Sequence, residues 1–212
     1  VQAKGVTLEL DGLTHGYFSE REDEVFTLGP VTLTLKPGEI TFLVGGNGSG
    51  KTTLAKLIAG LYVPESGEVR VDGRPVAADG RDDYRQLFSA VFSDFHLFDT
   101  LLEAPDSSLD SQASDWLAKL HLEHKVSVSN GSFSTRELSQ GQRKRLALIV
   151  ACLEGRPVII FDEWAADQDP AFREVFYCEL LPELRAQGKT LLVISHDDRY
   201  FHLADQLIKL ER

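Results

Sequence analysis

The stretch GGNGSGKTT, residues 45–53, fits the pattern G-x-x-x-x-G-K-[ST] and guides the interpretation of the whole chain. It follows the apolar run ITFLV (40–44) and precedes apolar residues at helical spacing over 54–61. Glycines let the backbone N–H groups of such a turn point inward, and the following helix N-terminus adds a partial positive charge. The loop is therefore suited to bind the phosphates of a nucleotide. The residues expected to bind them are Gly45, Gly46, Asn47, Gly48, Ser49, Gly50, Lys51, Thr52 and Thr53.

Strand-like and helix-like segments alternate along the chain, which predicts an α/β fold with a mostly parallel sheet. Continuous apolar runs such as VIIF (158–161) and TLLVIS (190–195) are typical of buried parallel strands. The runs VTLEL (6–10), VTLTL (31–35) and GEVRVDG (67–73) predict an antiparallel β portion near the start. The other expected elements are a strand at 206–210 and helices from Lys51, around 114–122, from Ser139 and from about Pro170.

Length and charge limit the classes of protein to which this chain can belong. A chain of 212 residues is long enough for one compact unit with at most a small subdomain. The region after about residue 94 is poor in strand signals, so we expect a helical subdomain there, at about 94–152, inserted in the core. The net charge of −11 provides no general positive field for nucleic acid. No stretch of the sequence reaches the roughly 18 consecutive apolar residues that are needed to span a bilayer.

Two further strand ends carry polar residues that suit a nucleotide site. Asp162 and Glu163 follow the run VIIF directly, and His196 follows TLLVIS. Lys51 would neutralise phosphate oxygens, and Thr52 and Asp162 would hold Mg²⁺ or its water shell. Glu163 beside them could polarise an attacking water, and His196 could hydrogen-bond the γ-phosphate. Open α/β sheets bind their ligands at this end of the strands.

The segment ELSQGQRKRLAL (137–148) predicts a second glycine-containing helix N-terminus. Ser139 and Gln142 form the pattern of a capping box, and Gly141 exposes backbone N–H groups between them. By itself this is the start of a well-capped helix. One nucleotide has little use for two such sites in one subunit, whereas two subunits facing head to tail would bring the second site of each onto the γ-phosphate held by the other.

With these motifs the chain resembles the nucleotide-binding domain of ABC transporters over essentially all of residues 1–212. GGNGSGKT stands for the Walker A motif of that family, VIIFDE for Walker B and LSQGQ for the signature. His196 corresponds to its switch histidine and Asp169 to its D-loop aspartate. Tyr17 corresponds to its adenine-stacking aromatic, with Phe18 as the competing choice and a core aromatic without a ligand role as the alternative. The resemblance implies a P-loop NTPase core, an ATP hydrolase with ATP and Mg²⁺ as cofactors, and an ATP-dependent homodimer. It implies Glu163, His196 and Lys51 as the catalytic residues.

Local departures from the usual motifs narrow the resemblance. DEW (162–164), followed by AADQD, resembles the same region of exporters that move cyclic or non-ribosomal peptides and siderophore precursors. The resemblance is to the pyoverdine-precursor exporters in particular. That group implies a transmembrane domain fused upstream, which binds the exported cargo, and a place on the cytoplasmic face of the bacterial inner membrane. The absence of methionine agrees with a domain taken from a longer chain.

The stretch VFSDFHLF (91–98) lies where this family usually carries the Q-loop glutamine, and Ser93 occupies the position of that glutamine. A serine hydroxyl is shorter, so we expect Ser93 to contact the metal through a water, or directly only if the loop moves inward, with Asp94 or His96 as weaker substitutes. The apolar residues after it could contact the membrane domain or form the core of the helical subdomain. These candidates are Phe95, Leu97 and Phe98.

Two other functions fit parts of the sequence. The first is a soluble ABC-type ATPase of the DNA-repair or chromosome type, but such proteins place a long coiled coil before the signature. Here about 45 residues intervene without sustained heptads. The second is a nucleotide-gated regulatory module that hydrolyses ATP poorly. The presence of Glu163 and His196 argues against this function.

Overall fold

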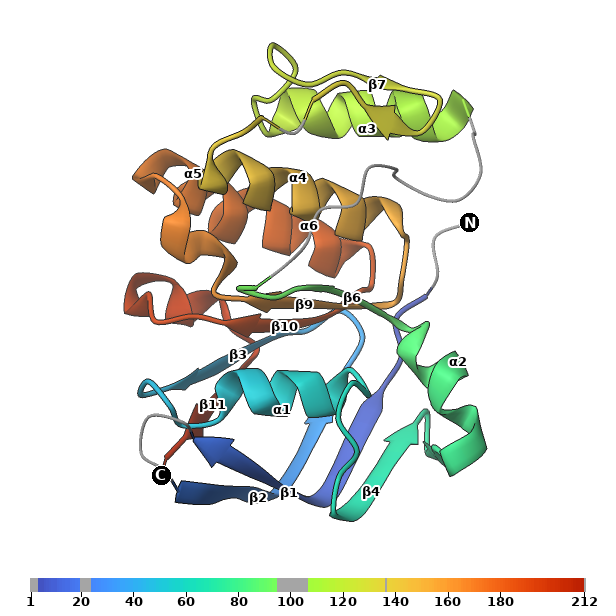
Figure 1. The fold of residues 1–212 in the computed structure, drawn as a ribbon, viewed down its shortest axis with the longest axis vertical. Helices are drawn as coiled ribbons and strands as arrows, with labels where there is room; N and C mark the ends of the chain where they lie inside the picture. Colours follow the sequence, from blue (N-terminus) through green and yellow to red (C-terminus); the bar gives the residue numbers. More distant parts are fainter. Residues whose placement is uncertain (1–3, 20–23, 95–106, 136, 212) are drawn as a thin grey trace.

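The computed structural model describes residues 4–19, 24–94, 107–135 and 137–211 (Figure 1). Five strands form a parallel sheet in the order β11-β3-β10-β9-β6. Their bounds are β3 Ile40–Gly45, β6 Phe88–Val91, β9 Val158–Asp162, β10 Thr190–Ile194 and β11 Gln206–Leu210. All residues of β9 and β10 are buried, which explains why these runs lack polar alternation. The predicted α/β fold with a mostly parallel sheet is confirmed.

Helices cover both faces of this sheet (Figure 1). On one face, α1 (Lys51–Ile58) packs through Leu54 and Ile58 into a hydrophobic core that includes Leu192 of β10. On the other face, α4 (Gln140–Leu153) and α6 (Leu181–Ala186) share a second core. The sheet contributes Phe42 and Phe161 to that second core. The N-termini of α1 and α4, which carry the two glycine-containing motifs, therefore belong to opposite faces of one sheet.

A second, antiparallel sheet has the strand order β2-β1-β4-β5. Its strands are β1 Leu8–Ser19, β2 Glu24–Leu35, β4 Ser66–Val71 and β5 Arg74–Pro75. The antiparallel portion expected from the sequence is present, but β1 and β2 extend far beyond the predicted strands 6–10 and 31–35. Residues 11–19 contain Gly12 and Gly16 and no clean alternation, so their strand structure depends on pairing with β2 and β4.

The described residues between β6 and β9 form two helices and a short hairpin. These elements are α3 Ser107–Lys119, the hairpin of β7 Val128–Ser129 with β8 Ser132–Phe133, and α4. α3 begins and ends earlier than the helix expected around 114–122. The proposed contact residues Phe95, Leu97 and Phe98, and His96 beside them, lie outside the described residues.

None of the described helices is long and apolar enough to cross a membrane.

Shorter elements link the main ones. After β9 the chain forms a 3₁₀ turn, η2, at Trp164–Asp167, then α5 Pro170–Val175 and a π-helical turn at Phe176–Leu180 that continues into α6. The remaining short elements are η1 Ala78–Gly80, α2 Arg81–Arg85 and η4 Asp198–Leu203. Since η2 follows Asp162 and Glu163 directly, it connects the predicted metal site to the rest of the second core.

Candidate functional site

The loop between β3 and α1 has the form of a phosphate cradle. Gly45 has φ 149°, and a Cβ atom there would lie 2.4 Å from the backbone oxygen of Leu210, so only glycine fits. α1 begins at Lys51, and its N-cap, Gly50, makes no side-chain hydrogen bond to the helix. The buried ammonium group of Lys51 donates to the backbone oxygens of Gly45 at 3.0 Å and Gly46 at 2.8 Å. The first turn of α1 thus keeps backbone donors available for a phosphate.

A pocket of about 200 Å³ opens over this loop and brings together residues that are distant in sequence. Tyr17 of β1 is one of them, and its hydroxyl donates to the backbone oxygen of Gly48 at 3.1 Å. Glu163, directly after β9, is another. The pocket is lined by Tyr17, Asn47, Gly48, Gly50, Lys51, Thr52, Thr53 and Glu163. An aromatic residue and an acidic residue therefore line one pocket together with the phosphate-binding loop.

Asp162 and Thr52 form the part of the site suited to a divalent cation. Oγ1 of Thr52 donates to Oδ2 of Asp162 at 2.9 Å. Oδ1 of Asp162 and Oγ of Ser49 are buried and have no hydrogen-bond partner among the described residues. Burial raises the pKa of Asp162, the hydrogen bond from Thr52 lowers it, and the charge of Glu163 raises it further. Oxygen donors that lack a partner fit Mg²⁺, which prefers carboxylate and hydroxyl oxygens together with phosphates and water.

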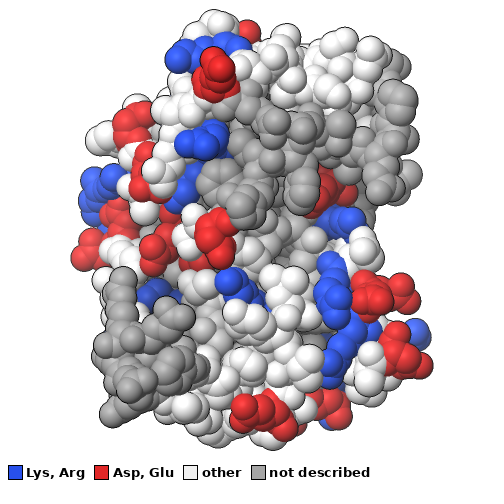
Figure 2. All heavy atoms as spheres, in the orientation of Figure 1, with Lys and Arg blue, Asp and Glu red and all other residues white. Residues whose placement is uncertain are grey.

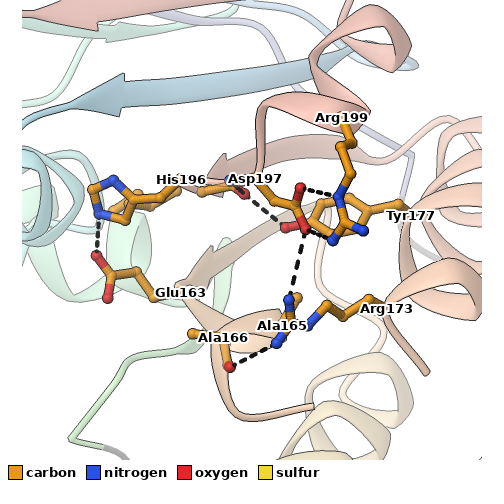
Figure 3. A pocket seen from close by; sticks show the side chains of 10 residues that line it. Glu163, Ala165, Ala166, Arg173, Tyr177, His196, Asp197 and Arg199 are labelled. Atoms are coloured by element: carbon orange, nitrogen blue, oxygen red, sulfur yellow. Dashed lines mark hydrogen bonds and ion pairs between the residues drawn. The ribbon is translucent and has the colours of Figure 1, made fainter. Parts of the chain in front are cut away.

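Glu163 and His196 meet at the carboxyl ends of two neighbouring strands. Nε2 of His196 lies 2.9 Å from Oε1 of Glu163, and Figure 3 shows the two side chains pointing toward each other. Glu163 has φ 52° and ψ 33°, a left-handed conformation that is uncommon for a residue with a side chain. Its N–H group donates to the backbone oxygen of Ile194 at 3.1 Å. The backbone of Glu163 is thus held in a form that directs its carboxylate toward His196.

A second cavity, of about 270 Å³, adjoins this pair (Figure 3). Asp197 holds Arg199 through two hydrogen bonds, of 2.8 and 2.6 Å, and Arg173 lies 3.9 Å away. These interactions, chiefly the hydrogen bonds from Arg199, lower the pKa of Asp197. At the back of the cavity the hydroxyls of Tyr177 and Ser195 are 2.7 Å apart. The segment after His196 is therefore fixed by its own charged neighbours.

Ser93 lies beside the metal-binding oxygens, but with its backbone rather than its side chain. The side chain is exposed, and the backbone N–H of Ser93 is directed at the Asp162 carboxyl group, whose charged form it favours. The neighbouring Asp94 pairs with Lys56 at 3.6 Å instead of turning toward the loop. A role for the Ser93 hydroxyl as a ligand stays a prediction.

The signature residues form a separate cluster that does not line this pocket. Ser139 accepts from the Gln142 N–H at 3.3 Å and its own N–H donates to Oε1 of Gln142 at 3.1 Å, which confirms the predicted capping box. Asp169 is the N-cap of α5, where it accepts from the Phe172 N–H at 3.1 Å. Ser139 and Asp169 are exposed, as expected for residues that would act on the nucleotide of another subunit.

Sequence reasoning missed the residues that join the signature helix to η2. Arg145 donates to Oε1 of Gln168 at 2.9 Å and to Oδ2 of Asp169 at 3.2 Å. Lys144, which is 2% exposed, pairs with Oδ2 of Asp167 at 2.7 Å. The signal available in the sequence was the unusual segment AADQD, whose polar side chains bind these two cations.

Comparisons with known proteins agree with this site. Residues 28–166 match the family model described as ABC transporter. The chain is 51% identical over 207 residues to the ATP-binding protein SyrD of Pseudomonas syringae pv. syringae, covering 96% of this chain and 37% of that protein. It is 28% identical to the probable syringafactin export ATP-binding/permease protein SyfD of P. syringae pv. syringae (strain B728a), covering 96% of this chain and 32% of that protein. The chain thus spans about a third of the length of these relatives.

A solved structure shares the fold over nearly its whole length. It is the dimeric post-hydrolysis state of an ATP-binding cassette bound to ADP and Pi, with a TM-score of 0.79 and 25% identity. The match covers 96% of this chain and 94% of that one. The phosphate loop, the acidic end of β9 and the capped signature helix therefore have a known family context. The chain belongs to the ABC transporter family, as an ATP-binding and ATP-hydrolysing domain of the P-loop NTPase fold that uses ATP and Mg²⁺.

Proposed function

We propose that this chain is the motor domain of an exporter and that Glu163, His196 and Lys51 carry out ATP hydrolysis. The contact of 2.9 Å between His196 and Glu163, beside the pocket of the phosphate loop, carries this proposal. A general base must be oriented toward the water it activates, and a partner that holds its carboxylate provides that orientation. A chain that only sensed nucleotide would not need this pair.

Each residue has a separate task in the proposed reaction. Glu163 accepts a proton from the water that attacks the γ-phosphorus, while the bond to the β-phosphate oxygen breaks and ADP leaves. His196 keeps Glu163 oriented before ATP binds, and its N–H turns to the γ-phosphate once ATP is bound. Lys51 moves from the loop oxygens to the phosphates and offsets their developing charge. Tyr17 stacks against the base at the pocket edge.

Thr52 and Asp162 are the residues that would hold Mg²⁺, with Ser93 reaching it through a water. The unpartnered Oδ1 of Asp162 supports this assignment. When bound, Mg²⁺ neutralises charge on the phosphate oxygens. Among the described residues there is no group of three or more His, Cys, Asp or Glu side chains that could hold a metal alone, so phosphate oxygens would complete the coordination.

A second copy of the chain completes each nucleotide site in this proposal. Ser139, Gly141 and Gln142 of one copy would face the phosphates held by the other, and Asp169 would lie at the contact between the copies. The separation of the signature cluster from the pocket of its own chain supports a head-to-tail arrangement. So does the similarity to a cassette that is dimeric in its post-hydrolysis state. Closing on ATP and opening after hydrolysis would provide the movement.

We also propose that a transmembrane domain, fused upstream, receives this movement and binds the cargo. A relative whose name combines ATP-binding and permease parts and records syringafactin export supports this architecture and direction. The DEW and AADQD segments support a peptide or siderophore precursor as cargo. The domain would then lie on the cytoplasmic face of the bacterial inner membrane. The subdomain at about 94–152, with Phe95, Leu97 and Phe98, would contact the membrane domain.

The test of the motor assignment is Glu163→Gln. Losing a positioned general base should lower kcat by roughly 10²-fold or more, while ATP binding is kept and an ATP-bound dimer accumulates. Steady-state phosphate release, nucleotide affinity and size-exclusion chromatography with ATP measure the three effects. Unchanged turnover in this variant would remove Glu163 from the mechanism. Slow turnover in the unsubstituted chain would favour the regulatory module instead.

The test of the transport assignment needs the full polypeptide in sealed vesicles. ATP-driven accumulation of a labelled peptide in inside-out vesicles supports export, and accumulation only in right-side-out vesicles contradicts it. Stimulation of hydrolysis by DNA would favour the soluble repair type. On the face drawn in Figure 2, basic and acidic side chains of the described residues are interspersed, without the continuous basic surface that DNA binding needs.

A further inference from the structure

We propose that Lys144 is a positioning residue that holds Glu163 in its active conformation and couples it to the signature helix. The inference rests on the proposed function, because it assigns Lys144 a task only if Glu163 activates water. Lys144 lies on the first turns of α4, and Glu163 lies at the junction of β9 and η2. The two are distant in sequence, and the packing of α4 against η2 brings them together.

The ammonium group of Lys144 bridges two groups of the η2 segment. Nζ lies 2.7 Å from Oδ2 of Asp167 and donates to the backbone oxygen of Glu163 at 3.3 Å. The side chain of Lys144 is 3% exposed, whereas that of Asp167 is 42% exposed. Burying an ammonium group costs free energy unless a counter-charge lies beside it, and Asp167 supplies that counter-charge. An apolar side chain would fill this position at lower cost, so the charge points to a function beyond packing.

The bond to the Glu163 oxygen bears directly on the proposed base. Glu163 is left-handed, and relaxation to an ordinary backbone conformation would turn its carboxylate away from His196. Its N–H group donates to the Ile194 oxygen, and its C=O group accepts from Lys144 at 3.3 Å and from the Ala166 N–H at 3.2 Å. The peptide groups on both sides of the residue are therefore fixed. Removal of Lys144 leaves the carbonyl of this strained residue with the Ala166 N–H of its own turn and without its hydrogen bond from α4, while the contact with β10 remains.

Further contacts make the first turns of α4 and η2 one mechanical unit. The indole N–H of Trp164 donates to the backbone oxygen of Lys144 at 2.8 Å. Nε2 of Gln168 donates to the backbone oxygen of Gly141 at 3.1 Å, and Nε2 of Gln140 lies 3.3 Å from Oδ2 of Asp167. A Cβ atom on Gly141 would lie 3.1 Å from the backbone oxygen of Asp167, so the close approach of the two segments depends on the signature glycine.

The consequence concerns communication between the two nucleotide sites. In the proposed dimer the N-terminus of α4 faces the nucleotide of the second copy, and Glu163 serves the nucleotide of its own copy. A shift of α4 on binding the partner's nucleotide moves Lys144, and with it the backbone of Glu163. Each site would therefore sense the occupancy of the other through Lys144, which predicts a steeper dependence of hydrolysis on ATP concentration with Lys144 than without it.

The first experiment is Lys144→Met, which keeps the length of the buried side chain and removes its charge. Misplacement of the base should lower kcat by about 10- to 10²-fold, with KM and the affinity for a fluorescent ATP analogue changed less than about twofold. The Hill coefficient for ATP should fall to 1. The matched control is Lys119→Met, which removes an ion pair between α3 and α6, with Glu183, and should leave kcat unchanged. An unchanged kcat in Lys144→Met overturns the inference.

The second experiment separates this inference from the proposed function. In a Glu163→Gln background, Lys144→Met should lower the residual rate by less than about twofold, because both changes act through one group. An equal fall in both backgrounds means that Lys144 does not act through Glu163, and overturns the inference while leaving the motor assignment intact. If Glu163→Gln has no effect by itself, the proposed function fails first.

Asp167→Asn provides a second variant, in which the change is made at the partly exposed partner and the buried lysine side chain is kept. It removes the counter-charge while Lys144 keeps its bond to the Glu163 oxygen. We expect a fall in kcat several-fold smaller than that of Lys144→Met, and again none when Asp167→Asn is combined with Glu163→Gln. A fall in the melting temperature with unchanged kcat would make the pair purely structural and overturn the inference.

Discussion

The N-termini of α1 and α4 are both glycine-containing helix starts, but they are built in opposite ways. α1 begins after Gly50 without a side-chain cap, and the ammonium group of its Lys51 donates to backbone oxygens of its own loop. α4 begins after Ser139 with a complete capping box, and its first turns are joined to η2 by charged and polar side chains. One helix start is open toward a pocket of its own chain, whereas the other is closed locally and held rigidly.

This difference indicates how the two starts contribute to one site. Free N–H donors and a lysine suit α1 to bind phosphates by itself. At α4 the capping box already uses the N–H groups of Ser139 and Gln142, so the N–H groups before Gln142 and the Ser139 hydroxyl are what it can offer. Such a site is too weak alone and suits contact with a nucleotide that another copy already holds.

The largest effect should come from Lys51→Ala, which tests the open start of α1. Loss of the cation should lower kcat/KM for ATP by about 10²- to 10³-fold, as expected for removal of one preorganised group that stabilises transition-state charge. Phosphate release over a range of ATP concentrations measures it. Lys56→Ala on the same helix, which removes the contact with Asp94, is the control and should stay within about twofold. Equal losses in both variants would mean that helix stability, not charge, is responsible.

A smaller effect is expected from Ser139→Arg, which tests the closed start of α4. A long cation at this exposed cap should prevent ATP-dependent dimerisation, while the affinity of the monomer for nucleotide stays within about twofold because α1 is untouched. Light scattering with and without ATP measures the dimer. Ser139→Ala removes only the cap, at about 1 kcal/mol, and should still dimerise. Normal dimerisation of Ser139→Arg would refute the head-to-tail arrangement.

The smallest effect is expected at Ser93, where only the backbone faces Asp162. Ser93→Ala should change kcat and the Mg²⁺ concentration for half-maximal activity by less than about twofold, since a water-mediated contact is worth little more. Ser93→Gln supplies a longer arm and should lower the Mg²⁺ requirement. Identical Mg²⁺ dependence in both variants would make residue 93 a hinge without a ligand role.

Much of the fold follows from local patterns in the sequence. β3, β9 and β10 are continuous apolar runs because both of their faces are covered, and their bounds agree with the prediction to within one residue. The long β1–β2 hairpin could not be predicted in the same way. Its residues 11–19 have weak local preferences and become strand through pairs such as Tyr17 with Phe26, which are set by distant segments.

The site residues also fall into two groups: those that a local sequence motif defines and those that only tertiary contacts bring together. The phosphate loop, Asp162, Glu163 and the capping box of Ser139 are defined by short contiguous motifs, and the motifs carry their own mechanism. Lys144 stands between two arginines in the sequence and has no local feature that distinguishes it. Its burial and its bond to the Glu163 oxygen arise only when η2 folds over α4.

The sequence by itself determined the family, the strand-loop-helix cradle and the residue types at the catalytic strand ends, because these depend on neighbours along the chain. Only the tertiary structure decided that Tyr17 and Glu163 line one pocket, that His196 contacts Glu163, and that Lys144 holds its backbone. These contacts join strands and helices far apart in sequence. The free energy that fixes them comes from the packing of two cores against one sheet, which no local pattern records.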